Sequence, residues 1–277
     1  MYFCWTKHVM SFFNNKVVVV TGGSDGIGKA LINALIPLGS KIATCGRNYD
    51  KLYHLQMQYS NVLLHAVACD VSKEDECKRF IESTIETFGT IDILINNAGV
   101  SMRSLFEDSN MDVIRRLMEV NFFGSVYCTK YALPEIMKQK GTIVGISSPA
   151  GYRGLPGRSG YSASKFALRG WLESLRTELL KTGVHVMWVS PGFTASNIRS
   201  AALNGKAELQ GESPLDESKL MTAEECARHI LHAIEKRKRT LTLTTSGKLT
   251  VFMNRFFPSL SDRLVYNYFY KKDHLVK

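Results

Sequence analysis

Short hydrophobic runs alternate along the chain with longer segments in which apolar residues recur at helical spacing. The runs cover 16–20, 41–45, 62–69, 91–95, 141–146 and 184–189, and an alternating segment at 239–245 resembles a last strand. Helical spacing covers 29–38, 74–88, 111–133, 161–180 and 223–236. Strands that alternate with helices predict an α/β fold, a Rossmann-type doubly wound parallel sheet, with its ligand crevice at the carboxyl ends of the strands.

A glycine-rich turn separates the first strand from the first helix. Its spacing is G-x-x-x-G-x-G, and strand, glycine turn and helix follow in the order that a dinucleotide site requires. Glycines allow a pyrophosphate to approach the free N–H groups of the helix N-terminus, although an ordinary loop between strand and helix is the alternative. The residues expected to bind cofactor here are Gly22, Ser24, Asp25, Gly26, Ile27 and Gly28.

The second strand ends in Gly46, Arg47 and Asn48, where a site for NAD usually carries an acidic residue for the ribose hydroxyls. A guanidinium pairs with phosphate through two parallel hydrogen bonds. Arg47 therefore favours NADP(H), with its 2′-phosphate, over NAD. A solvated loop arginine is the alternative interpretation.

Two further strand ends carry candidate cofactor contacts. Asp70 and Val71 follow the third strand, where Asp70 either accepts a hydrogen bond from the adenine amine or caps the next helix. Asn97, Ala98 and Gly99 follow the fourth strand, and small residues there let a cofactor pass close to the backbone.

Tyr161 and Lys165 stand four residues apart at the start of a long helical pattern, so their side chains share one helix face. A cation near a phenol favours the phenolate, which predicts a device for proton transfer. Ser148 ends the fifth strand thirteen residues before Tyr161 and is placed to reach a substrate oxygen. Asn121 interrupts the pattern of 111–133, and a mid-helix asparagine commonly points to solvent.

The segment after the sixth strand lies where a nicotinamide ring would be bound. Its candidate contacts are Pro191, Gly192, Thr194 and Ser196. The pattern then weakens over 200–218, which predicts a mobile loop over the site. Such a loop either acts as a lid or has no function.

Taken together, these motifs resemble the short-chain dehydrogenase/reductase family over about 15–245. The matching pieces are the glycine turn, Asn-Asn-Ala-Gly at 96–99, Asn121, Ser148, Tyr161-x-x-x-Lys165 and Pro191-Gly192. The resemblance implies that Tyr161 exchanges a proton with the substrate oxygen and that Ser148 holds that oxygen. It implies that Lys165 binds the nicotinamide ribose and lowers the pKa of Tyr161, and that Asn121 anchors a water in the proton relay.

The chain departs from the family pattern at two positions. Asp25 stands where many members that use NADP carry a basic residue, so the cofactor prediction rests almost alone on Arg47. Ser196 replaces a common threonine but keeps a hydroxyl for the carboxamide. The Tyr-x-x-x-Lys spacing disfavours the enoyl-reductase branch, so an enzyme of carbonyl or alcohol chemistry is expected.

Composition agrees with one soluble domain, because 45% of the 277 residues are hydrophobic and 22% are charged. We expect an N-terminal extension at 1–14, a catalytic domain at 15–246 and a C-terminal extension at 247–277. The opening segment lacks the features of a signal peptide, and no apolar run of eighteen residues is present. Six cysteines without a C-x-x-C pair indicate a reducing, cytoplasmic location and no metal site.

The charge of +10 is concentrated at the end of the chain, where residues 228–277 hold eleven Lys or Arg against Glu235, Asp262 and Asp273, a net +8. This end is also rich in Phe and Tyr. It suits peripheral contact with a membrane surface, the entrance for a hydrophobic substrate, or burial in the core or a dimer contact. No motif for specific nucleic-acid recognition accompanies it.

The sequence predicts an NADP(H)-dependent oxidoreductase that interconverts a hydrophobic ketone and its secondary alcohol. The segment 120–127 and the helix of Tyr161 are similar to those of 3-ketosphinganine reductases and other lipid or steroid carbonyl reductases, and a 3-oxoacyl substrate fits the same chemistry. A binding protein that senses cofactor without turnover is the alternative. By analogy with the family, the long helices pair subunits into a homodimer or homotetramer.

Overall fold

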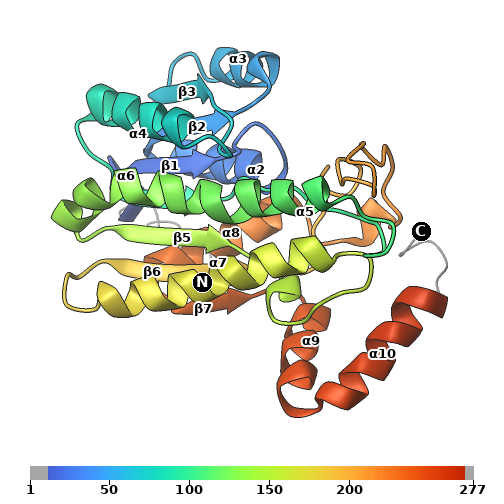
Figure 1. Cartoon of the computed structure of the whole chain (residues 1–277). Coiled ribbons are helices and arrows are strands. Elements are labelled where there is room, and N and C mark those ends of the chain that lie inside the picture. Colours follow the sequence, from blue (N-terminus) through green and yellow to red (C-terminus); the bar gives the residue numbers. More distant parts are fainter. Residues whose placement is uncertain (1–11, 272–277) are drawn as a thin grey trace.

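Seven parallel strands form one sheet at the centre of the molecule (Figure 1). The computed structural model describes residues 12–271, so the expectations for the opening segment lie largely outside the described residues. The strand order is β3-β2-β1-β4-β5-β6-β7, and every neighbouring pair runs parallel. The strands are β1 (Val17–Thr21), β2 (Lys41–Gly46), β3 (Leu64–Ala68), β4 (Ile93–Asn96), β5 (Thr142–Ile146), β6 (His185–Ser190) and β7 (Thr240–Thr242). The predicted Rossmann-type sheet is therefore confirmed.

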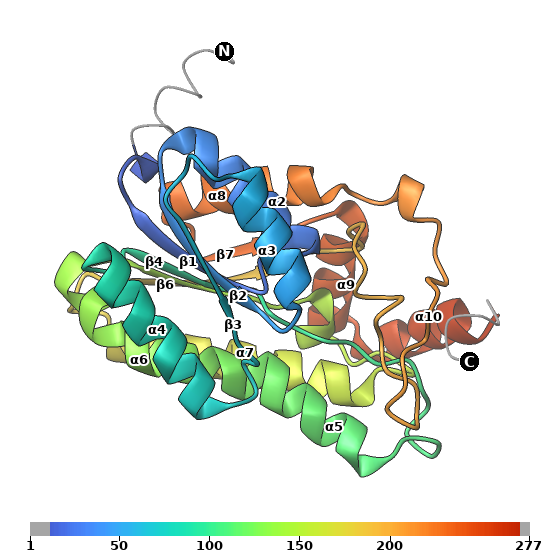
Figure 2. The same ribbon diagram turned by 90° about the horizontal axis from the view of Figure 1, so that it is seen from above.

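Helices cover both faces of the sheet (Figure 2). One face carries α2 (Gly26–Leu35), α3 (Tyr49–Gln58) and α8 (Ala223–Glu235), and the other carries α4 (Glu74–Phe88), α5 (Met111–Met118), α6 (Gly124–Gln139) and α7 (Ser159–Glu178). Short helical turns complete the set: η1 (Ile36–Leu38), η2 (Glu119–Phe123), η3 (Pro149–Gly151) and η4 (Glu217–Lys219). Of these helices, α3 had no counterpart in the sequence prediction.

The first strand shows how the sequence builds two cores. Successive side chains of a strand point to opposite faces of the sheet. Val18 and Val20 accordingly pack with α2 and α8, whereas Val19 packs with α4, α6 and α7. Both faces are buried, which is why the strand reads as a continuous hydrophobic run rather than an alternating one.

The long helix predicted at 111–133 is interrupted. The helix α5 ends at Met118, the π-helical turn η2 follows, and α6 then continues to Gln139. A π turn inserts one extra residue and turns the following side chains relative to a regular helix. Asn121 lies in this turn and is fully buried, so the interpretation that it points to solvent is wrong.

Two helices follow β7 and stand at one end of the sheet (Figure 1). These are α9 (Thr245–Phe256) and α10 (Pro258–Lys271), and they make up the described part of the predicted C-terminal extension. Asn254 and Arg153 fasten α9 to the turn after β5, because Arg153 Nη1 donates to Asn254 Oδ1 at 3.1 Å and Asn254 Nδ2 donates to the Tyr152 carbonyl at 2.8 Å. Within residues 12–271, no helix has the length and apolar character needed to cross a membrane.

Candidate active site

A cavity of about 1180 Å³ lies at the carboxyl ends of the strands. Nearly all residues predicted from the sequence contribute to its wall. These are Gly22, Ser24, Asp25, Gly26, Ile27, Arg47, Asn48, Asp70, Val71, Asn97, Ala98, Gly99, Ser148, Tyr161, Lys165, Pro191, Gly192, Thr194 and Ser196. Gly28 and Asn121 are the two predicted residues that do not line it.

The glycine turn packs tightly against the end of β4. Gly22 has φ +69°, and a Cβ there would lie 2.9 Å from Ala98 Cα. A Cβ on Gly28 would lie 2.3 Å from the Gly22 carbonyl oxygen, so Gly28 allows α2 to start against the turn rather than touching a ligand. Thr21 Oγ1 accepts hydrogen bonds from the amides of Asn97 and Ala98, each at 3.0 Å. The close approach of two backbones leaves the helix N-terminus open toward the cavity.

Asp25 caps α2 and joins three parts of the chain. Its carboxylate accepts from the Gly26 amide at 2.8 Å, from Lys51 Nζ at 2.6 Å and from Asn197 Nδ2 at 3.0 and 3.1 Å. Partial burial opposes ionisation, but the hydrogen bonds from Lys51, Asn197 and Gly26 hold the pKa of Asp25 below its usual value. The acidic residue thus organises the turn, with its charge partly neutralised by Lys51.

Two cations line the wall at the end of β2. Arg47 is exposed to the cavity, and Lys51 follows it one helical turn later. Asn48 caps α3 by accepting a hydrogen bond from the Lys51 amide at 2.8 Å, which fixes Lys51 at the start of that helix. Sequence analysis missed Lys51 because it did not predict α3.

Asp70 lies on the cavity wall and does not cap the next helix, because the N-cap residue of α4 is Lys73 and no side chain caps that helix. Its Oδ1 accepts from the Ser72 amide at 3.0 Å and from the Ser72 hydroxyl at 2.8 Å, in the turn that leads into α4. The same residue lines the cavity with Val71. The hydrogen bonds to Ser72 therefore leave Asp70 on the ligand wall.

Ser148, Tyr161 and Lys165 converge on one part of the cavity wall. Lys165 is 4% exposed, its Nζ donates to the Ile146 carbonyl at 2.8 Å, and it lies 5.8 Å from the centre of the Tyr161 ring. Ser148 precedes η3, and its hydroxyl accepts from the Ala150 amide at 3.1 Å. The side chains come from the end of β5 and from one face of α7, as their spacing predicts.

Burial controls the ionisation of this group. It raises the pKa of Tyr161 above its usual value, and this effect outweighs the lowering by Ser148, Arg158 and Arg199. Burial also lowers the pKa of Lys165 to about 8. The phenol is therefore protonated at neutral pH and is ready to donate. Two of the groups that lower the pKa of Tyr161, Arg158 and Arg199, were not predicted from the sequence.

Asn121 connects the β4 end to α7 from inside the protein. Its Oδ1 accepts from the Val100 amide at 2.8 Å, and its Nδ2 donates to the Val100 carbonyl and the Ser164 hydroxyl, both at 2.9 Å. Every polar atom of the side chain is thus used by protein groups. The amide thereby positions Val100 and Ser164, which are neighbours of Tyr161.

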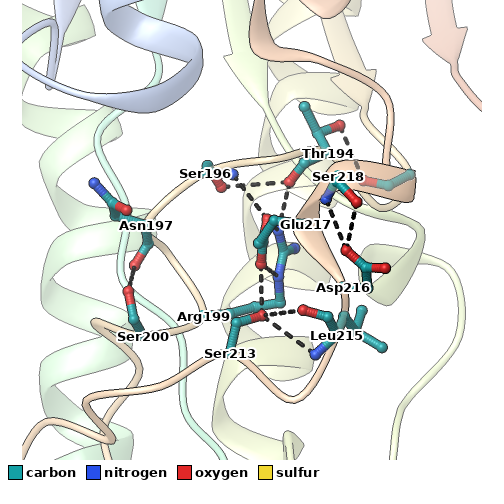
Figure 3. Close-up of polar contacts among 11 residues, drawn as sticks. Thr194, Ser196, Asn197, Arg199, Ser200, Ser213, Leu215, Asp216, Glu217 and Ser218 are labelled. Atoms are coloured by element: carbon teal, nitrogen blue, oxygen red, sulfur yellow. Dashed lines mark hydrogen bonds and ion pairs between the residues drawn. The ribbon is translucent and has the colours of Figure 1, made fainter.

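The predicted loop at 200–218 belongs to the segment between β6 and α8, which contains a half-buried ion pair between Arg199 and Glu217 (Figure 3). Arg199 is 7% exposed, its Nε donates to Glu217 Oε1 at 2.6 Å, and its Nη2 donates to Glu217 Oε2 and the Thr194 carbonyl. Glu217 also accepts from the Ser196 amide at 3.3 Å and from the Ser213 hydroxyl at 2.5 Å. The ion pair therefore ties the loop to the segment after β6.

The far end of the cavity is apolar. Leu155 and side chains from α9 and α10 form this end, and Phe269 is buried against Leu155, Leu105 and Val265. The large apolar and aromatic members from the two helices are Leu249, Met253, Leu264, Val265, Tyr268 and Phe269. An apolar end suits the hydrocarbon part of a ligand.

The rest of the wall fits a dinucleotide. The cradle formed by Gly22 and Ala98 is too close for a side chain, the N-terminus of α2 faces the cavity, and Arg47 and Lys51 stand at the end of β2. These are groups that hold a pyrophosphate and a ribose phosphate. The described residues hold no cluster of His, Cys, Asp and Glu suited to a metal ion.

Known proteins are similar to this chain in sequence. A family model described as short chain dehydrogenase matches residues 16–207. The chain is 32% identical to Dehydrogenase/reductase SDR family member 7B of Mus musculus over 92% of this chain and 81% of the relative. It is 34% identical to 11-beta-hydroxysteroid dehydrogenase-like 4A of Arabidopsis thaliana over 89% of this chain and 82% of the relative.

Solved structures agree with the fold. A short-chain dehydrogenase/reductase from Burkholderia phymatum in complex with NAD superposes with a TM-score of 0.79 at 22% identity, covering 90% of this chain and 95% of the other. An alcohol dehydrogenase from Thermococcus sibiricus complexed with 5-hydroxy-NADP gives a TM-score of 0.72 at 25% identity, covering 83% and 95%. With the match of the family model and the two relatives, these findings show that the chain belongs to the short-chain dehydrogenase/reductase family.

Proposed function

We propose that this member of the family is an NADP(H)-dependent oxidoreductase that interconverts a hydrophobic ketone and its secondary alcohol. One observation carries the proposal: Ser148, Tyr161 and Lys165 meet on the wall of a cavity that joins a dinucleotide cradle to an apolar end. The cofactor supplies or accepts a hydride at the substrate carbon. The chain's own residues orient the substrate and handle the proton.

Tyr161 is the proposed acid and base. In the direction of reduction, its protonated phenol donates a proton to the substrate oxygen, and the Ser148 hydroxyl donates a hydrogen bond to the same oxygen. Lys165, held by the Ile146 carbonyl, is placed to bind the nicotinamide ribose with its remaining hydrogens. Asn121 does not line the cavity, and its hydrogen bonds hold the Val100 backbone and the Ser164 hydroxyl in place.

The preference for NADP(H) rests on the charges at the end of β2. Arg47 makes no ion pair with any described residue, and Lys51 lies beside it on the cavity wall. A 2′-phosphate would find the unpaired guanidinium of Arg47 there, with Lys51, whose charge is shared with Asp25, beside it, whereas the carboxylate typical of NAD sites is missing from this position. The structural relatives include both an NAD and a 5-hydroxy-NADP complex, so the argument comes from Arg47 and Lys51.

The substrate class follows from the walls of the cavity. Leu249, Met253 and Phe269 line an end that suits an acyl chain or a fused ring system. Ketones of the 3-ketosphinganine, 3-oxoacyl and steroid kinds are therefore our candidates, and the Arabidopsis relative is named 11-beta-hydroxysteroid dehydrogenase-like 4A.

Two exposed aromatic surfaces are proposed to contact other subunits and a membrane. Phe122, Phe123, Tyr127 and Trp171 cluster where η2, α6 and α7 meet, and Phe123 is 37% exposed, which supports a homodimer or homotetramer through these helices. Exposed aromatics on α9 and α10 support peripheral membrane contact. The five described cysteines are free and buried, which fits the cytoplasm.

A panel of ketones tests the proposal. Oxidation of NADPH is followed with ketones of graded chain length, 3-keto sphingoid bases and steroids, and kcat/KM should rise with the apolar length. NADH serves as the matched cofactor. Tight binding of NADPH without turnover of any ketone would refute the enzyme and favour the alternative, a protein that senses the cofactor.

A further inference from the structure

A group of arginines surrounds the substrate end of the cavity. Arg158 lies directly before α7, three residues from Tyr161, and lines the cavity with Arg199. Arg103 lies behind them and is only 6% exposed. Burial and the neighbouring guanidiniums of Arg103 and Arg199 lower the pKa of Arg158, while Tyr161 opposes this shift. The four groups are therefore close enough to interact electrostatically.

The acidic groups near these arginines are too few to balance them. Arg199 has Glu217, but Arg103 and Arg158 form no ion pair with any residue in the range 12–271. The carboxylates on the cavity wall are Asp25 and Asp70, and both belong to the nucleotide end. The substrate end is therefore positively charged, and a buried charge without a counter-ion is costly.

Arg158 is anchored in a way that leaves donors available. Its Nη1 donates to the Ser101 hydroxyl at 2.9 Å and to the Met102 carbonyl at 3.1 Å, which fixes the plane of the guanidinium. Its Nε and Nη2 have no acceptor among the described residues. A guanidinium held on one edge presents the other edge to a carboxylate or phosphate.

We propose that the substrate carries an oxyanion, a carboxylate or a phosphate, in addition to its apolar chain, and that Arg158 binds this oxyanion next to Tyr161. The inference rests on the proposed function, because it assigns the substrate of that same site. The apolar wall from α9 and α10 takes the chain and Arg158 takes the charge. The substrate is therefore amphipathic.

Binding of matched ligands tests the inference without turnover. Decanoate, decyl phosphate and 1-decanol are titrated by calorimetry into the full chain saturated with NADPH. At least one anion should bind about tenfold or more tightly than the alcohol, which is the gain of a hydrogen bond to a charged group. The preferred anion distinguishes a carboxylate substrate from a phosphate substrate.

Variants assign the effect to one guanidinium. Arg158→Met should remove the advantage of the anion, Arg158→Lys should retain part of it, and Arg169→Met should keep it fully. Arg169 belongs to α7, the helix that begins directly after Arg158, but does not line the cavity, so its loss controls for total charge. Affinity for NADPH and the thermal midpoint report whether each variant is folded.

Equal affinity of the alcohol and both anions for the unaltered chain would overturn the inference, whatever the variants do. Tighter binding of the anion that persists in Arg158→Met would also overturn the inference. A variant that changes only the pH profile of turnover would do the same, because Arg158 would then act only on the ionisation of Tyr161. A selective anion site in a chain that reduces no ketone would instead refute the proposed function and leave the site standing.

Discussion

At the scale of single residues, Arg47 sets the cofactor preference in our account. Arg47→Asp should lower the ratio of kcat/KM for NADPH to that for NADH by roughly tenfold to a hundredfold, because a charge-assisted pair with the 2′-phosphate is replaced by repulsion. Arg79→Asp, which changes an exposed arginine on α4, is the control. An unchanged ratio in Arg47→Asp would contradict the assignment of NADP(H).

Lys165 makes a prediction about stability and pH. The pKa of this buried lysine is about 8 in the folded chain, against an ordinary value of 10.5. Between these values the unfolded chain holds a proton that the folded chain has released, so the stability contributed by Lys165 rises with pH over this window. Relative to Lys165→Met, the unaltered chain should gain up to about 3 kcal/mol from pH 8 to 10.5.

Urea unfolding at several pH values measures this difference, since other titrating groups cancel between the two chains. Lys181→Met removes an exposed lysine and should show no such trend. A difference between the unaltered chain and Lys165→Met that is constant with pH would show that burial of Lys165 does not shift its titration.

At the scale of elements, the position of the segment between β6 and α8 depends on the ion pair between Glu217 and Arg199. Glu217→Gln leaves the guanidinium of Arg199 buried without its counter-ion. We expect a loss of about 1 to 2 kcal/mol, less than for a fully buried pair because Glu217 is 34% exposed. Hydrogen exchange over 200–220 should become faster. Glu212→Gln, an exposed change in the same segment, is the control, and equal exchange in both variants would count against the ion pair as the restraint.

The elements also show what the sequence could predict. The central strands β1, β4, β5 and β6 are buried on both faces of the sheet and read as continuous hydrophobic runs, whereas the less buried edge strand β7 was predicted from its alternating pattern. The break at η2 was not, because the pattern of apolar residues continues through it while the backbone gains a π turn around Asn121. The helix α3 was missed because it buries only Leu52 and Leu55 and carries little periodic signal.

The candidate site divides in the same way. Motif residues such as Tyr161 and Ser148 were found from short-range spacing. The sequence did not predict Lys51, Arg158 and Arg199, because their roles depend on contacts between segments far apart in the sequence. The hydrogen bond from Asn197 to Asp25, across 172 positions, is another contact of this kind. Spacing within a helix or turn predicts the first kind of residue but carries no information about the second.

At the scale of the whole molecule, α9 and α10 present aromatic residues outward. Phe252 and Phe256 are 53% and 56% exposed and contact each other one helical turn apart, with Lys248 and Arg255 on the same helix. Replacing both phenylalanines with serine should reduce flotation with vesicles that contain phosphatidylserine by several-fold. The control replaces Tyr49 and Tyr53, an exposed stacked pair on α3, and a similar loss in both variants would argue against a specific membrane face.

We propose that Tyr161 exchanges a proton with the substrate carbonyl, while the other residues of the cavity wall supply most of the affinity for the cofactor. Turnover of the best ketone and affinity for NADPH, measured together in Tyr161→Phe, test it most directly. We predict that kcat falls by about a hundredfold to ten-thousandfold, the usual contribution of a general acid, while the affinity for NADPH changes little. Undiminished turnover in Tyr161→Phe would contradict the account.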